Sequence, residues 1–188
     1  EPGFYLSHPV EILKIWRGGL ASHGAGAGII LAFYLYSRKT PDQPFLWILD
    51  RVALTTALGA AFVRIGNLFN SEIIGKPTAG DWGVIFKRVD LMPRHPTQLY
   101  ESAAYLLIFF ILLGVYLNRG LAKRQGLLVG LTLVLLTPAR ALIEVFKENQ
   151  SAFEEGWALN LGQLLSIPFF LLGCYFIYRS FRTTPSHR

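Results

Sequence analysis

Long apolar runs alternate with short polar segments along most of the chain. A transmembrane helix needs about 20 apolar residues, within a range of roughly 17–25. The runs that meet this length are residues 20–36, 45–69, 99–117, 126–146 and 159–178. The pattern therefore predicts an all-α integral membrane protein, a polytopic helix bundle with about five transmembrane helices.

The connection between the second and third runs, residues 70–98, is the long one. Proline and glycine residues punctuate it, and the stretch VIFKRV at residues 84–89 predicts a short strand between them. Long loops in compact domains are often functional. We expect one long external loop with a role in function, although an ordinary connection fits the same pattern.

Composition and charge support this assignment. Of the 188 residues, 52% are apolar and 16% are charged, whereas soluble domains carry about 25% charged residues. The net charge is +6, but many of the basic residues gather in alternate connections: Arg38, Lys39, Arg51, Arg119, Lys123, Arg124, Arg179, Arg182 and Arg188. This positive-inside pattern places these segments and the C-terminus in the cytoplasm. The positive charge thus reflects topology, and no nucleic-acid partner is expected.

No internal repeat or second soluble domain interrupts the pattern, so residues 1–188 are expected to form a single transmembrane domain. The chain begins at Glu1 rather than methionine, which suggests that it starts part-way into a longer protein.

The second apolar run ends in polar residues, in the stretch FVRIGNLFNSEIIG at residues 62–75. Arg64 and Asn67 are three positions apart and project from one face of a helix, while Asn70 and Glu72 follow at its end. A lone arginine here would be explained by snorkelling to the interface. The cluster of polar neighbours instead favours a site.

Arg140 and Glu144 lie four positions apart in the fourth run, so they share a helical face and can pair. Pro138, just before them, predicts a kink. An ion pair that satisfies only itself explains both residues. However, a charge at mid-span costs about 2.5–3.5 kcal/mol on insertion scales, and such residues mark functional sites by default.

Two further polar groups open spans. His23 opens the first run, where a glycine packing motif formed by Gly24 and Gly28 is an equally open explanation. The stretch RHPTQLYES, residues 94–102, opens the third run, and helix capping and interface anchoring explain part of it. With the predicted topology, all four polar groups fall in the outer half of the membrane. This convergence predicts one polar cavity.

Two arginines in such a cavity suit a phosphate, because the guanidinium fork matches its oxygens. At this depth the phosphate would belong to a phospholipid headgroup. Neither His23 nor His95 has a partner at zinc-ligand spacing. We therefore expect chemistry without a metal or other cofactor.

These blocks together resemble a known family. VRIGNLFNSEIIG is similar to the signature of the prolipoprotein diacylglyceryl transferases, and GGLASHG, RHPTQLYE and ARALIEVFKE resemble further blocks in the same order. Val63, Leu68 and Lys147 depart mildly from it, standing where glycine, phenylalanine and arginine are usual. Members usually have seven spans, so the first two are implied to be missing here.

The resemblance implies an enzyme of the bacterial cytoplasmic (inner) membrane, with its active site toward the outer leaflet. Its partners would be phosphatidylglycerol and a prolipoprotein signal peptide. The enzyme would transfer diacylglyceryl to the lipobox cysteine thiol and release glycerol phosphate. Catalytic roles fall to His23, Arg64 and Arg140, and substrate binding to Arg64, Asn67, Asn70, Glu72, Gly75, Arg140 and Glu144.

In the implied mechanism, His23 removes the thiol proton, since a thiolate is the attacking species. Arg64 and Arg140 stabilise the departing phosphate. Glu144 would orient Arg140, while Asn67 and Glu72 would hold the glycerol headgroup or position Arg64. The alternative is a non-catalytic membrane carrier or binder of an anionic lipid headgroup.

Overall fold

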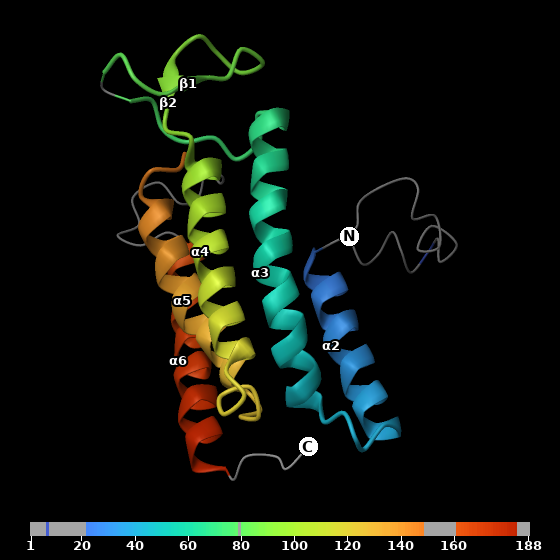
Figure 1. Cartoon of the computed structure of the whole chain (residues 1–188). Coiled ribbons are helices and arrows are strands. Elements are labelled where there is room, and N and C mark those ends of the chain that lie inside the picture. The colour runs from blue at the N-terminus through green and yellow to red at the C-terminus, as the bar shows by residue number, and fades with distance from the viewer. Residues whose placement is uncertain (1–6, 8–21, 79, 149–160, 184–188) are drawn as a thin grey trace. The chain divides into compact units, whose positions relative to one another are not determined.

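The computed structural model describes residues 7, 22–78, 80–148 and 161–183, with the side chains of residues 22, 23 and 161–165 left aside (Figure 1). The chain forms two compact units, Glu1–Phe45 and Leu46–Arg188. Each unit is described by itself.

The first unit contains helix α2, Ser22–Lys39, which covers the first predicted span. Arg38 and Lys39 occupy its last turn, where positive charge is favourable against the helix dipole. The backbone N–H of Thr40 then donates to the Tyr36 carbonyl at 3.0 Å and closes the helix end.

The second unit is a set of helices that run side by side (Figure 1). They are α3 (Phe45–Asn70, which begins at the unit boundary), α4 (Thr97–Leu117), α5 (Leu127–Glu144) and α6 (Leu161–Arg182). Among the described helices, α3, α4 and α5 are long and apolar enough to cross a membrane. The all-α membrane class is thus confirmed, while membrane crossing by α2 and α6 and the external side of the long loop stay predictions.

The predicted strand is present but shorter. Strand β1 (Val84–Ile85) pairs antiparallel with β2 (Pro93–Arg94) at the end of the bundle where α3 ends and α4 begins (Figure 1). The six-residue prediction was too long because the chain turns after Ile85: the N–H of Val89 donates to the Phe86 carbonyl at 2.7 Å.

Small residues let the helices approach closely. Ala57 and Ala61 of α3 are fully buried against Tyr105, Ile108 and Leu112 of α4. Between α5 and α6, a Cβ on Gly130 would lie 2.9 Å from Ile177 Cγ1, and one on Gly173 would lie 2.9 Å from the Gly130 carbonyl oxygen. Close backbone approach through small residues is the usual packing of membrane helices.

The opposite end of the bundle is fixed by Asp50. Its carboxylate accepts hydrogen bonds from the backbone N–H groups of Gly126 (2.7 Å) and Val129 (3.0 Å). A buried side chain of α3 therefore caps the N-terminus of α5, where N–H groups lack helical partners. Gly126 allows the entry to α5 because its φ is +89°.

Candidate active site

The polar cluster at the end of α3 forms through a tight helix C-terminus. Ser71 takes a left-handed conformation (φ 59°), and the N–H groups of Ser71 and Glu72 donate to the carbonyls of Leu68 (3.1 Å) and Asn67 (2.9 Å). This is the Schellman pattern. It turns the chain back, so that Asn67 Nδ2 donates to Glu72 Oε2 at 2.8 Å.

Arg64 joins this cluster, as the sequence predicts. Its Nη1 donates to Asn67 Oδ1 at 3.2 Å, and its Nε lies 2.9 Å from Glu101 Oε2. The second contact is a Coulombic one rather than a directed hydrogen bond, because Glu101 Oε2 has no hydrogen-bond donor of suitable angle. Asn70 lies outside the cluster: it is exposed, and its side chain has no hydrogen bond to any described residue.

Glu101 is the centre of a buried ion network. Its side chain is 0% exposed, and its Oε1 accepts hydrogen bonds from Lys147 Nζ at 2.9 Å and from the Tyr105 hydroxyl at 3.3 Å. A buried charge needs such pairing to be tolerated. The predicted site set omits Glu101 and Lys147, although both lie in the stretches that carried the resemblance.

The expected pairing of Arg140 with Glu144 is wrong. Glu144 Oε2 instead accepts from Lys147 Nζ at 3.2 Å, because the chain turns after α5 and brings Lys147 inward between two carboxylates. Within the part of the chain that the structure describes, the Arg140 side chain has no hydrogen bond or ion pair. None of the described residues therefore occupies its guanidinium.

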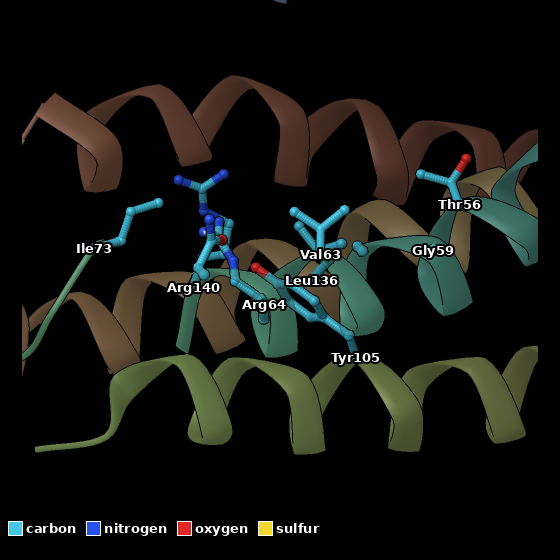
Figure 2. Close-up of a pocket in the computed structure, with 10 residues that line it drawn as sticks. Thr56, Gly59, Val63, Arg64, Ile73, Tyr105, Leu136 and Arg140 are labelled. Carbon is cyan, nitrogen blue, oxygen red and sulfur yellow. The ribbon is translucent and has the colours of Figure 1, made fainter. Parts of the chain in front are cut away.

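A cavity of about 590 Å³ opens beside these residues. It is lined by Thr56, Gly59, Ala60, Val63, Arg64, Asn67, Ile73, Tyr105, Leu136 and Arg140. Figure 2 shows Arg64 and Arg140 at one end with Ile73 beside them, while Val63 and Gly59 lie toward the other end. The cavity thus joins a cationic end to a mainly apolar remainder, a division that suits a phospholipid.

The loop after α3 is tied down next to the cavity. Gly75 packs so closely that an added Cβ would lie 2.3 Å from the His95 carbonyl oxygen, and its own carbonyl accepts from Arg94 Nη1 at 3.1 Å. Gly75 also bridges to Lys147 in an antiparallel pair. Close packing therefore explains why a glycine is needed at position 75. Its predicted role in substrate binding remains a prediction.

Arg94 holds the same loop from within. Its Nε donates to Asp90 Oδ2 at 3.0 Å and its Nη1 to Glu148. These bonds, that to Asp90 first, raise the pKa of the buried Arg94, and the bond to Arg94 lowers the pKa of the Asp90 carboxyl. The pairing fixes the hairpin to the segment after α5.

His95 is packed among aromatic rings. Its ring centroid lies 4.9 Å from that of Trp82 and 5.1 Å from that of Phe146, and its Nδ1 lies 3.3 Å from the Tyr100 hydroxyl. The neighbouring Gln98 is buried and donates from Nε2 to the Glu72 carbonyl at 2.7 Å. His95 and Gln98 thus fix the loop after α3 and the segment after α5 to the start of α4.

Comparison with known proteins decides the family. A family model for prolipoprotein diacylglyceryl transferase matches residues 3–179. The chain belongs to this family. The resemblance carried by the four sequence blocks is thereby confirmed, as is the assignment to a class of transferases.

Curated relatives agree. The phosphatidylglycerol–prolipoprotein diacylglyceryl transferase of Tolumonas auensis is 53% identical over 173 residues, which cover 92% of this chain and 67% of that protein. The enzyme of the same name from Chloroherpeton thalassium is 51% identical over 180 residues, covering 96% of this chain and 67% of its own length. That of Bacteroides fragilis is 43% identical over 190 residues, covering 95% and 68%.

Some of the predicted site residues therefore lie together in the structure. The structure brings Arg64, Asn67, Glu72 and Arg140 together around or next to one cavity. Glu144 does not line the cavity; it forms an ion pair with Lys147, which also binds Glu101. His23 is in the first turn of α2, but its side chain lies outside the described residues, so its place relative to the cavity stays a prediction.

Proposed function

We propose that this protein transfers the diacylglyceryl group of phosphatidylglycerol to the lipobox cysteine thiol of prolipoproteins and releases glycerol phosphate. The observation that carries the proposal is the placement of Arg64 and Arg140 at one end of a largely apolar cavity. Membership of the transferase family supports it.

The two arginines would have different roles. Arg64 is committed to Glu101 and Asn67, so its position is fixed before substrate enters. Arg140 has no such partner among the described residues and would supply the bidentate fork for the phosphate. The apolar remainder of the cavity would take the acyl chains next to the reacting glycerol carbon.

The chemistry needs a thiolate and a stabilised leaving group. The cysteine thiol loses its proton to a base, and its sulfur attacks the glycerol carbon that bears the phosphate ester. A carbon–sulfur bond forms as the carbon–oxygen bond breaks, and the electron pair leaves on the phosphate oxygen. Arg140 and the fixed Arg64 would stabilise the negative charge that grows there.

The remaining predicted residues take supporting roles. We propose His23 as the base, because an ordinary histidine pKa near 6.5 lets it accept a proton at neutral pH. Asn67 and Glu72, linked at 2.8 Å, would face the glycerol headgroup, with Asn70 at the rim. Glu144 would act through Lys147, and not directly on Arg140.

The site is proposed to face the outer leaflet of a bacterial inner membrane, with five spans and the C-terminus in the cytoplasm. Single cysteines test this topology. A cysteine at Asp81 should react with an impermeant maleimide added outside intact cells, and one at Arg124 should not. The reverse labelling pattern would place the cavity in the inner leaflet.

Transfer is tested with the protein in nanodiscs that contain phosphatidylglycerol, given a peptide that carries a lipobox cysteine. The peptide should gain the mass of one diacylglyceryl group, and glycerol phosphate should appear in equal amount. Arg140→Gln should abolish both products, while Arg119→Gln, at an exposed position beyond the C-terminus of α4, should not. Phospholipid movement across a bilayer without peptide modification would support the carrier instead.

A further inference from the structure

The hairpin between α3 and α4 exposes large apolar side chains. Leu91 is 78% exposed, and Trp82, Ile85, Val89 and Met92 are also exposed. Scattered apolar residues at a surface are normal, but a contiguous group marks an interaction surface. This group falls within one short segment, residues 82–92.

These side chains stay exposed although the hairpin is well anchored. Phe86 is 3% exposed, and the N–H of Thr78 donates to the Pro93 carbonyl at 2.8 Å. Gly83 lies against β2, where an added Cβ would meet the Arg94 carbonyl oxygen at 2.7 Å. One side of the hairpin therefore packs on the protein, while the other is presented outward by a fixed backbone.

Positive charge lies among the exposed apolar residues. Lys87 and Arg88 are exposed and have no hydrogen bond or ion pair with a described residue. Asp90, the acid inside the hairpin, is bound to Arg94. Asp81, at the foot of the hairpin, is exposed and has no hydrogen bond or ion pair from its side chain to a described residue.

The position of the hairpin indicates what it meets. It joins α3 to α4, two of the candidate membrane spans, and only His95 and Pro96 separate β2 from the start of α4. The exposed surface thus lies where the chain leaves the bilayer. Apolar side chains interleaved with lysine and arginine are typical of segments that bind an anionic membrane interface.

We propose that the exposed side chains of Ile85, Lys87, Arg88, Val89, Leu91 and Met92 dock on the anionic phospholipid surface that surrounds the cavity. The apolar side chains enter the headgroup region, and the two basic side chains bind lipid phosphates. Docking would hold the loop that carries Gly75 and Ile73 against the membrane beside the end of the cavity where Arg64 and Arg140 lie (Figure 2). The inference concerns lipid contact, and it stands whether or not transfer occurs.

Fluorescence in nanodiscs tests the proposal. Leu91→Cys or Met92→Cys, each in a Cys174→Ala background because Cys174 is exposed, is labelled with an environment-sensitive fluorophore. The matched control is a label at Asp81→Cys. In bilayers containing phosphatidylglycerol, headgroup-labelled quencher lipids should quench positions 91 and 92 more than position 81. In purely zwitterionic bilayers this difference should shrink.

Charge variants separate lipid contact from other effects. Lys87→Gln with Arg88→Gln should lower the ratio of docked to undocked hairpin about fivefold for each residue removed, since each basic residue near an anionic surface contributes on that order. Arg119→Gln with Lys123→Gln, an equal change of charge elsewhere, should leave the ratio unchanged.

Three results would overturn the proposal: equal quenching at positions 81 and 91, quenching that ignores lipid charge, or a response that appears only when the lipobox peptide is added. The last result would assign this surface to the peptide substrate. Transfer activity measured on the same samples reports on the cavity separately.

Discussion

Arg64 Nε lies 2.9 Å from Glu101 Oε2, and the other oxygen of that carboxylate lies 2.9 Å from Lys147 Nζ. One buried carboxylate therefore holds two cations that come from different parts of the chain. The Glu101 carboxylate neutralises only part of their charge, and Glu144 approaches Lys147 at 3.2 Å. Arg140 has no counter-anion among the described residues. This arrangement suits a site that binds a phosphate.

Glu101→Gln should destabilise the protein and impair transfer. Removing the charge leaves the partly buried Arg64 without a carboxylate among the described residues and leaves Lys147 with Glu144 alone, and breaking a buried ion pair typically costs about 3–5 kcal/mol. Thermal unfolding in detergent measures the stability, and the peptide mass assay measures transfer. Glu72→Gln is the matched control, because Glu72 is exposed and should cost little stability. Wild-type unfolding and transfer in Glu101→Gln would refute a central role for this carboxylate.

Arg140→Lys should have the opposite signature: a stable protein that has lost transfer. No described residue bonds to the Arg140 side chain, so its replacement leaves none of them unpaired. Lysine keeps the charge but loses the bidentate fork, and loss of such a stabilising group commonly lowers kcat by about 10²–10³-fold. Unfolding temperature and initial rates over a range of phosphatidylglycerol concentrations separate the two effects. Transfer near the wild-type rate would show that point charge suffices.

Gly75→Ala should disturb the loop without touching the cationic end of the cavity. An added Cβ would lie 2.3 Å from the His95 carbonyl oxygen and 2.9 Å from Thr97 Cγ2, and overpacking of this kind costs about 1–3 kcal/mol. Gly80→Ala is the control, since its Cβ would meet Trp82 at an ordinary 3.5 Å. Hydrogen exchange of residues 75–78 should rise in Gly75→Ala alone. Equal exchange in the two variants would contradict the packing role.

The parts of the fold that were predictable are those with a local cause. Apolar runs of spanning length located the helices, and the three-residue spacing of Arg64 and Asn67 placed their side chains within hydrogen-bond reach. The pairing of Glu101 with Arg64 and Lys147 depends on helix packing and on the turn after α5, which no local pattern encodes. The assumed pair of Arg140 and Glu144 failed for the same reason, because spacing along a helix does not reveal a competing lysine beyond its end.

Acid should loosen the hairpin through Asp90. The hydrogen bond from Arg94 lowers the pKa of this carboxyl, so the folded state favours its ionised form. The contribution to stability is present above the unfolded pKa, about 3.9, and is lost as the pH falls through the lower folded value. Hydrogen exchange of residues 84–94, corrected for its intrinsic pH dependence, should rise in that range. Asp90→Asn should show the raised exchange already at neutral pH, and a pH response that persists in this variant would rule out Asp90 as its source.

Ile73 offers the sharpest separation of strain from substrate contact. Its φ of 53° is a left-handed conformation that a β-branched residue rarely adopts, and strain of this kind costs about 1–3 kcal/mol. The Thr97 hydroxyl, which donates to the Ile73 carbonyl at 3.3 Å, helps to hold it. The side chain lines the cavity beside Arg64 and Arg140 (Figure 2).

Ile73→Gly should therefore keep or raise the unfolding temperature while it weakens the use of phosphatidylglycerol, seen as a higher KM. Ser71→Gly is the matched control: Ser71 has a similar φ of 59° but does not line the cavity, so relief of strain there should leave KM unchanged. Ile73→Asn adds a polar side chain that tolerates the left-handed region, and it should also raise KM because apolar contact is lost. If KM stays at the wild-type value in both Ile73 variants, the strained residue serves the turn alone and makes no contact with the lipid.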